Sequence, residues 1–182
     1  MDNWSTTISV SRNIFLQKLC AQDTNAVFEL IDRNREHLSC FGENIATRFQ
    51  TRDSVHQDIV TPEEPSIINY GIWFQETYKG FSDQREYLGS INVRPNKIAK
   101  AMIGCYLGEK YQKQGIMTRA ISSLASHAFE QVNLRELIAK VHKENSASAK
   151  VLERVGFSKS KVEIHPLTHR LYTLKNPHSQ NI

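Results

Sequence analysis

The part of this sequence best suited to chemistry is a loop that enters a helix at a glycine. Residues 109–118 follow a short apolar segment, residues 101–107, and Gly115 stands where a helix would begin. The first turn of a helix leaves backbone N–H groups without partners, and its dipole favours negative charge there. Because glycine lets a phosphate approach the backbone closely, the loop predicts an anion-binding helix start, to which Lys110 and Lys113 add charge. A glycine at such a junction is more often an ordinary turn.

A second junction of the same kind spans residues 143–150. Asn145 is expected to cap the helix that follows, because its side chain can accept a hydrogen bond from the first turn. Ser148 lies one turn into that helix, near the side on which Asn145 points. A hydroxyl group there could reach a ligand threaded between two strands, or it could simply be a solvated helix residue.

Hydrophobic periodicity supplies the elements that must position these junctions. Strands are expected at residues 14–19, 67–75, 87–93, 101–107, 134–142 and 169–174. Helices are expected after Asp23, after Thr51, from Gly115 and from Asn145 to Gly156. The order β-α-α-β-β-β-α-β-α-β predicts an α/β (α+β) fold in which a mixed sheet carries helices on both faces.

Two of the expected helices have a clear apolar face. The first carries Val27, Leu30, Ile31 and Leu38, and the helix from Gly115 carries Met117, Ala120, Ile121, Leu124, Ala128 and Phe129. Such spacing is typical of surface helices that pack one side on a core.

Composition places the chain among ordinary globular proteins. Its 182 residues, of which 40% are apolar, fit one domain over 1–182, with a core from about 12 to 175 and a flexible tail from 176 to 182. The three cysteines lie far apart with no CxxC pair, which favours a reducing compartment over a disulfide framework or a zinc site. No apolar run is as long as a membrane span, and no dense basic tract indicates a nucleic-acid-binding protein. We therefore expect a cytoplasmic protein that binds no metal, no membrane and no nucleic acid directly.

Charge is distributed unevenly along the chain. Residues 109–161 hold ten Lys/Arg and five Glu, a net of +5, whereas residues 52–86 hold seven Asp/Glu and three Lys/Arg, a net of −4. The asymmetry is either chance or a basic half for a polyanionic ligand and an acidic segment for a cationic one.

The succession of these two strand-to-helix junctions resembles the pattern of the GNAT superfamily of N-acetyltransferases. Within that superfamily the chain is most similar to the ribosomal-protein N-terminal acetyltransferase branch. The resemblance is carried by Ile103-Gly104-Cys105-Tyr106-Leu107, by Tyr111-Gln112-Lys113-Gln114-Gly115-Ile116-Met117-Thr118, by Asn145-Ser146-Ala147-Ser148 and by Val155-Gly156-Phe157. It covers roughly residues 101–157. It implies a mostly antiparallel sheet with a splayed pair of strands, one ending at Leu107 and one at His142.

The resemblance also implies where acetyl-coenzyme A, the co-substrate, would bind. Its pyrophosphate would rest on the helix start formed by Gln112, Lys113, Gln114, Gly115, Ile116, Met117 and Thr118. Its pantetheine arm would contact the backbone of Cys105, Tyr106 and Leu107 and the side chain of Asn145. Ser148 would lie near the sulfur as a general acid, and a backbone N–H of the splayed strand would polarise the acetyl carbonyl.

The sequence departs from the family pattern at the phosphate loop and at the base. The loop keeps only Gly115, with Met117 in the place of a second glycine or alanine. Met102 replaces a glutamate that could deprotonate the amine. The candidate replacement bases are Glu43, Glu76 and Glu86, and deprotonation through an ordered water is the alternative. Cys105 could compete as a nucleophile, although the family mechanism is direct transfer.

The sequence therefore predicts an enzyme, an N-acetyltransferase acting directly on a primary amine, with a protein N-terminal α-amine as the expected acceptor. A small amine such as a polyamine, an aminoglycoside or an aminoacyl compound is the alternative acceptor. A non-catalytic acyl-coenzyme A-binding module is the alternative of another class. The chain is expected to be a monomer or a homodimer.

Overall fold

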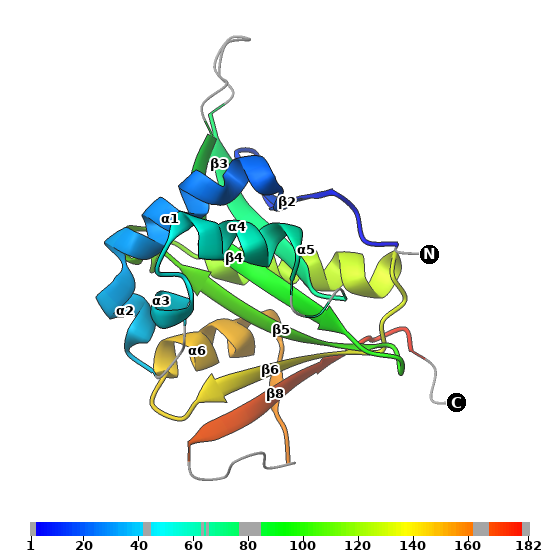
Figure 1. The fold of residues 1–182 in the computed structure, drawn as a ribbon. Coiled ribbons are helices and arrows are strands. Elements are labelled where there is room, and N and C mark those ends of the chain that lie inside the picture. The colour runs from blue at the N-terminus through cyan, green and yellow to red at the C-terminus, as the bar shows by residue number, and fades with distance from the viewer. Residues whose placement is uncertain are drawn as a thin grey trace.

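The computed structural model describes residues 3–41, 45–62, 64, 66–76, 85–161 and 168–179. Within them a central sheet of eight strands is covered by helices on both faces, as Figure 1 shows. The strands are β1 Thr7–Ser9, β2 Ile14–Lys18, β3 Ile68–Gln75, β4 Arg85–Pro95, β5 Lys100–Leu107, β6 Glu136–His142, β7 Ser158–Lys159 and β8 His169–Lys175. All six expected strands are present, and β1 and β7 are additional.

The sheet is mixed and mostly antiparallel, which confirms the predicted fold class. Its order is β1-β2-β3-β4-β5-β6-β8-β7. Only β5 and β6 run parallel among the paired strands described, and every other neighbouring pair is antiparallel. The loop expected between β3 and β4, residues 77–84, lies outside the described residues.

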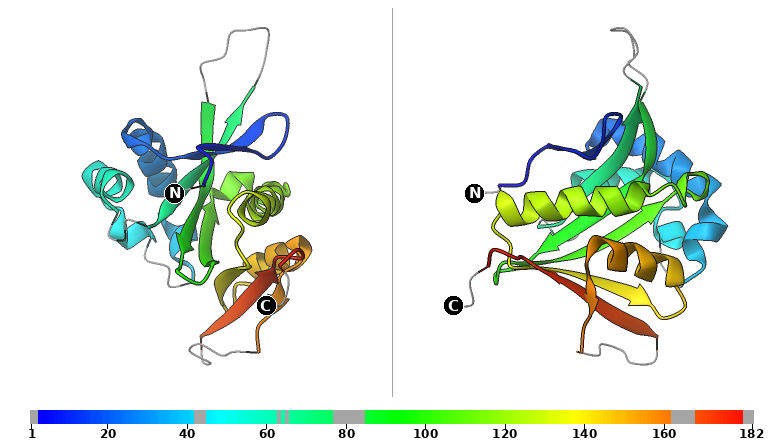
Figure 2. Two further views of the ribbon diagram at one scale, coloured as in Figure 1. Left: turned by 90° about the vertical axis from the view of Figure 1, so that its right-hand side faces the viewer. Right: turned by 180° about the vertical axis from the view of Figure 1, so that it is seen from behind.

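The helices form a layer on each side of the sheet. One layer contains η1 Ala21–Asp23, α1 Thr24–Arg33, α2 Arg35–Ser39, α3 Ile45–Arg48 and α4 Arg52–Val60. The other contains α5 Ile116–Glu130 and α6 Ser146–Val155, and η2 Glu109–Tyr111 leads into α5. Seen along the sheet edge in the left view of Figure 2, the two layers lie on opposite sides of the strands. Among the described residues, no helix is both long and apolar enough to span a membrane.

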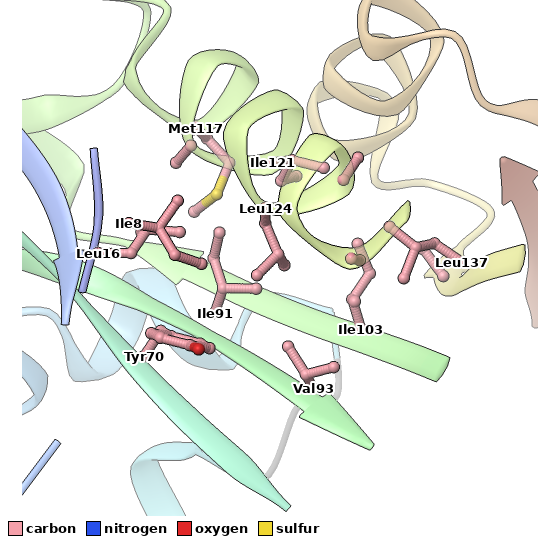
Figure 3. Close-up of a cluster of buried hydrophobic side chains, with 14 of the residues drawn as sticks. Ile8, Leu16, Tyr70, Ile91, Val93, Ile103, Met117, Ile121, Leu124 and Leu137 are labelled. Carbon is pink, nitrogen blue, oxygen red and sulfur yellow. The ribbon is translucent and has the colours of Figure 1, made fainter. Parts of the chain in front are cut away.

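Helix α5 packs on the sheet through the face that the sequence predicted. All six of its expected apolar residues are buried, and they belong to the larger core cluster. Figure 3 shows Met117, Ile121 and Leu124 pointing from the helix towards strand residues. The strands contribute Ile91 and Ile103 to the same cluster. Burial of this stripe, at about 25 cal/mol per Å² of apolar surface, is the main force that holds α5 in place.

The first expected helix is divided in two at Asn34. Its apolar residues are buried as predicted, but Leu38 belongs to α2 rather than to α1. The carboxamide of Asn34 donates to the carbonyl oxygen of Leu30 at 2.7 Å and accepts the N–H of Glu109 at 2.9 Å. Asn34 therefore ends α1 and ties it to the loop that precedes α5.

The N-cap of α1 is Asp23, as predicted, but its side chain does not cap that helix. The Asp23 carboxylate is 2% exposed; it accepts the N–H of Cys20 at 2.9 Å and pairs with Arg85 at 2.5 Å. A buried carboxylate needs a charged partner, and the guanidinium of Arg85 on β4 outcompetes a single backbone N–H.

The two ends of the chain are more closely attached than the expected boundaries of the core suggest. Trp4 and Ile8 are buried in the larger core cluster, ahead of the expected start at residue 12. Asn176, expected to open a flexible tail, is buried, and its carboxamide donates to the carbonyl oxygen of Leu134 at 2.8 Å. Residues 180–182 lie outside the described residues.

Candidate active site

A wedge opens between β5 and β6 in the middle of the sheet. Their parallel pairing ends where Ile103 faces Ala139. Beyond that point β5 continues beside β4 to Leu107, and β6 continues beside β8 to His142. The two strands diverge with α6 lying over the gap between them (Figure 1). Backbone groups on the facing edges of the wedge are thus not used by a β5–β6 ladder, and the two strands end where the sequence predicted.

The start of α5, to which the sequence assigned an anion, contains two residues with left-handed backbone. Gly115 is the N-cap, in a left-handed conformation with φ of 70°, and it makes no side-chain cap to the first turn. Lys113 also has a positive φ, 60°. Met117, which stands in the place of the family's second glycine or alanine, turns its side chain into the core (Figure 3). Because glycine has no side chain, residue 115 cannot cap the N–H groups of the first turn of α5.

Polar side chains of the loop before α5 are tied to neighbouring elements. Lys110 pairs with Glu86 at 2.8 Å, and the hydroxyl of Tyr111 donates to the same carboxylate at 2.5 Å. The pKa of Glu86 is lowered, first by its bond with Lys110 and then by that with Tyr111. Nε2 of Gln112 lies 2.6 Å from Nε2 of His37 on α2. These contacts tie the loop to β4 and to α2.

Helix α6 begins as the sequence predicted. Asn145 is its N-cap, and Oδ1 of Asn145 accepts the backbone N–H of Ser148 at 3.0 Å. Ser148 is half-buried, and its hydroxyl is not used by the cap. The helix ends at Gly156, which is left-handed with φ of 105°. Helices α5 and α6 pack against each other, so the two predicted junctions lie on the same side of the sheet.

The expected cofactor residues of β5 point to opposite faces. Cys105 packs against the larger core cluster on the α5 side, whereas Tyr106 packs against the smaller cluster under α1 and α4. The hydroxyls of Tyr106 and Tyr87 are 2.9 Å apart, and burial is the main reason that the pKa of each is raised. Leu107 ends the strand in the larger cluster.

A cavity of about 290 Å³, lined by both polar and apolar side chains, lies on the other face of the sheet, under α1, α3 and α4. Its floor is formed by Asn69 on β3, Asn92 on β4 and Gly104 on β5, which are consecutive cross-strand partners. Cys105 and Tyr106, at the edge of the wedge, also line it. The cavity therefore reaches β5 from the face opposite to α5.

Three charged side chains stand among the described residues that line this cavity. They are Arg48 on α3, Asp58 on α4 and Arg94 on β4. Nη2 of Arg48 is 2.5 Å from Oδ1 of Asp58, and Nη1 of Arg94 donates to Oδ1 of Asn92 at 2.9 Å. The Asp58 side chain is 20% exposed. Two guanidiniums and one carboxylate thus face a common space.

The structure does not bring the expected bases into this cavity. Glu86 is exposed and held by Lys110, and Glu76 is exposed at the end of β3. Glu43 lies outside the described residues. Met102 is half-buried on β5, opposite Arg94. The aromatic side chains of Trp73 and Phe74 on β3 pack in the core.

Sequence reasoning missed the cavity, although one signal for it exists. Asn69, Ser90 and Asn92 are polar residues inside expected strands, and strand alternation puts all three on one face. Polar residues on a face that a helix covers mark a site rather than a core. Asp58 carries no comparable signal, because it is one of several acidic residues in residues 52–86.

Comparisons with known proteins agree with this architecture. Residues 13–158 match the family model described as the acetyltransferase (GNAT) domain. The ribosomal-protein-serine acetyltransferase of Escherichia coli is 25% identical over 158 residues, which cover 83% of this chain and 82% of that protein. A solved structure of RimL, a ribosomal L7/L12 α-N-protein acetyltransferase in complex with coenzyme A, superposes with a TM-score of 0.78 at 19% identity over 93% of this chain and 97% of that one.

A second structure, the ribosomal-protein-S5-alanine acetyltransferase of Vibrio fischeri, is similar to the same degree. Its TM-score is also 0.78 at 19% identity, and the match covers 97% of this chain and all 100% of that one. At 19% sequence identity, the structural similarity supports the fold alone.

Proposed function

The chain belongs to the GNAT family of N-acetyltransferases, and on this premise we propose that it transfers the acetyl group of acetyl-coenzyme A to the α-amine at a protein N-terminus. The proposal joins two halves of the site that lie on opposite faces of the sheet and meet at β5. One half binds the co-substrate and the other binds the acceptor.

The cofactor half is assigned to the wedge and the starts of α5 and α6. Backbone N–H groups of residues 113–118 would hold the pyrophosphate, because a helix start offers unpaired donors and a favourable dipole. The β5 backbone at Cys105, Tyr106 and Leu107, beyond the end of the β5–β6 ladder, would hold the pantetheine arm together with Asn145. The end of the β5–β6 pairing at Ile103 and Ala139 and the left-handed turn at Gly115 support this assignment.

The charge of the cavity is the observation that carries the acceptor assignment. One carboxylate, Asp58, faces two guanidiniums, those of Arg48 and Arg94. Polyamines and aminoglycosides carry several ammonium groups, which two guanidiniums would repel. A peptide N-terminus carries a single ammonium next to carbonyl groups. The carboxamides of Asn69 and Asn92 and the guanidinium of Arg94 offer donors to such carbonyls.

Ser148 and the wedge backbone supply the remaining chemistry in this proposal. The hydroxyl of Ser148 would give a proton to the departing thiolate, which makes it a better leaving group. A backbone N–H at the β5 edge would stabilise the negative charge that develops on the acetyl oxygen. The likeness to named ribosomal-protein acetyltransferases supports the acceptor class but not a particular protein.

A panel of acceptors tests the proposal directly. Thiol release from acetyl-coenzyme A is followed with peptides that begin with serine or alanine, with the same peptides blocked by an N-terminal formyl group, with an aminoacyl ester, and with spermidine. We expect turnover of the free peptides and none of the blocked ones. Turnover of spermidine without that of any peptide would overturn the acceptor assignment.

Calorimetry separates the enzyme from a non-catalytic acyl-coenzyme A-binding module. We expect binding of acetyl-coenzyme A together with transfer to at least one acceptor in the panel. Tight binding with no acetyl transfer to any acceptor would favour the module.

A further inference from the structure

Asp58 occupies an unusual position for a carboxylate. It lies on α4 three residues after Val55, which is 1% exposed, and beside Ile59. Residues at this spacing share one face of a helix, and here that face lines the cavity. Placing a carboxylate on the covered face of a helix costs free energy unless it is paired. The pair with Arg48 at 2.5 Å offsets part of that cost but does not explain why a charge stands there.

The surroundings of Asp58 are those of an amine site. The carboxamides of Asn69 and Asn92 and the glycine backbone at Gly104 form the floor across from it. Gly104 has no side chain, and the Asn92 amide fills that space: a Cβ at Gly104 would lie 3.0 Å from Oδ1 of Asn92. Gly104, Cys105 and Tyr106 of β5 all line the cavity, so the cavity extends to the strand segment that borders the wedge.

Asp58 is also the only carboxylate among the described residues that line the cavity. The family glutamate is replaced by Met102, and Glu86 and Glu76 lie elsewhere. An amine arrives as ammonium and cannot attack until it loses a proton. A carboxylate that faces the acceptor from the opposite wall meets this need.

We propose that Asp58 binds the acceptor ammonium in this cavity and takes its proton, an inference that rests on the proposed amine transfer. The nitrogen lone pair then forms the C–N bond to the acetyl carbon while the C–S bond breaks, and the new amide nitrogen gives up its second proton to solvent. The sulfur keeps the bonding pair and receives a proton from Ser148, which regains one from solvent. Asp58 releases its proton to solvent when the acetylated product leaves. Arg48 positions the carboxylate through Oδ1.

The first test is Asp58→Asn, which keeps the shape of the side chain and removes its charge. General-base catalysis contributes about 10²- to 10⁴-fold, so kcat/KM for a peptide acceptor should fall by about 100-fold or more. The affinity for acetyl-coenzyme A, measured by calorimetry, should stay within about twofold, because the cofactor half is on the other face. Binding of the peptide to the enzyme saturated with coenzyme A, a readout independent of turnover, should weaken.

Two matched variants separate this role from a structural one. Asp53→Asn makes the same change at an exposed position of the same helix, and it should leave both activity and peptide binding unchanged. Arg48→Gln removes the ion pair but keeps the Asp58 carboxylate. Its kcat/KM should therefore fall much less than that of Asp58→Asn. Equal losses in Arg48→Gln and Asp58→Asn would show that only the ion pair matters, and would overturn the proposal.

The pH dependence gives a readout that a structural role would not produce. An α-amine with a pKa of about 7.7 to 8.0 is roughly one-seventh neutral at pH 7 and more than nine-tenths neutral at pH 9. The defect of Asp58→Asn relative to the unaltered enzyme should therefore shrink several-fold from pH 7 to pH 9. A defect that is constant over this range would contradict proton transfer to Asp58.

Other groups around Asp58 do not confuse that measurement. Arg48 on α3 and Arg94 on β4 keep their charge throughout the range, since a guanidinium is always protonated. The pKa of Tyr106 on β5 is raised by burial, and the charge of Asp58 raises it further. His56 on α4 is bonded to the hydroxyl of Thr24 at the start of α1.

Failure of this proposal can be told apart from failure of the proposed function. If peptides are not substrates but a small amine is, the same variants are measured with that amine. Asp58→Asn with full activity towards the working acceptor would overturn the role of Asp58 and leave the transferase assignment standing.

Discussion

The carboxamide of Asn92 lies against the bare Cα of Gly104, its cross-strand partner on β5. An added Cβ would lie 3.0 Å from Oδ1 and 3.1 Å from Nδ2 of that carboxamide, closer than an ordinary van der Waals contact. The contact explains why a glycine stands in the middle of an otherwise apolar strand. It also joins the cavity proposed for the acceptor to the strand that borders the wedge.

Gly104→Ala should therefore damage the acceptor side more than the cofactor side. The methyl group would push the Asn92 carboxamide, and with it the hydrogen bond to Arg94, into the cavity. We expect the KM for a peptide acceptor to rise about tenfold, a cost of about 1.4 kcal/mol, while the Kd for acetyl-coenzyme A changes little. In the double variant Gly104→Ala/Asn92→Ala the steric conflict is gone, so its KM should equal that of Asn92→Ala alone. A further rise in KM in the double variant would point to a cause other than this contact.

Gly115→Ala tests the helix start assigned to the pyrophosphate. Gly115 has φ of 70°, and an L-residue pays about 1–2 kcal/mol in that conformation. The matched control is Gly156→Ala at the end of α6, where φ is 105° and an added Cβ would lie 3.6 Å from Leu174. Both variants should lower the free energy of unfolding in urea. Only Gly115→Ala should also weaken binding of acetyl-coenzyme A, and equal binding in the two variants would argue against a pyrophosphate at α5.

Ser148→Ala tests the proposed general acid. The cap of α6 uses the backbone N–H of Ser148, so the variant should fold normally. We expect turnover to fall about 100-fold, within the range of a lost acid–base group, with the Kd for acetyl-coenzyme A nearly intact. Ser146→Ala, at an exposed position of the same helix, should be fully active. Full activity of Ser148→Ala would reduce Ser148 to an ordinary helix residue.

His127 makes the attachment of the N-terminal segment dependent on pH. Its Nε2 accepts the N–H of Ser5 at 3.1 Å, and its ring is 5.7 Å from that of Trp4. Burial lowers the pKa of His127, and the charge of Lys18 lowers it further. The neutral ring is thus favoured in the folded protein. Its contribution to stability is complete above the unfolded-state pKa of about 6.5, and it is lost as the pH falls through the lowered pKa of the folded state.

Amide exchange at Ser5 measures this effect. Protection of Ser5, corrected for intrinsic exchange, should fall between pH 7 and pH 5, because the protonated ring can no longer accept its N–H. His127→Gln keeps an acceptor that does not titrate, and its Ser5 protection should not follow this pH dependence. Protection that is constant with pH in the unaltered protein would contradict the prediction.

Local patterns were reliable wherever one segment determined its own structure. The stripe of α5, the Asn145 cap and the glycines that bound α5 and α6 are governed by residues within a few positions of one another. Periodicity and capping follow from backbone geometry, which is the same in any fold. The two junctions of the candidate cofactor half were predictable for this reason.

Partners from distant segments changed the outcome where they competed with a local rule. Asp23 was expected to cap α1, but Arg85 lies 62 positions further along the chain and takes its carboxylate. Asn34 interrupts an otherwise continuous helical pattern and accepts the N–H of Glu109, 75 positions away. No window of the sequence contains both members of either pair.

By itself the sequence determined the fold class, the family and the two helix starts assigned to acetyl-coenzyme A, because each depends on short-range pattern. Only the tertiary structure shows which carboxylate lines the cavity that we propose for the amine. Glu43, Glu76 and Glu86 were chosen by residue type, whereas Asp58 is distinguished only by the strands that α4 covers. A cavity is made by side chains from several elements packed at once, and its charge is therefore set by packing rather than by the order of residues along the chain.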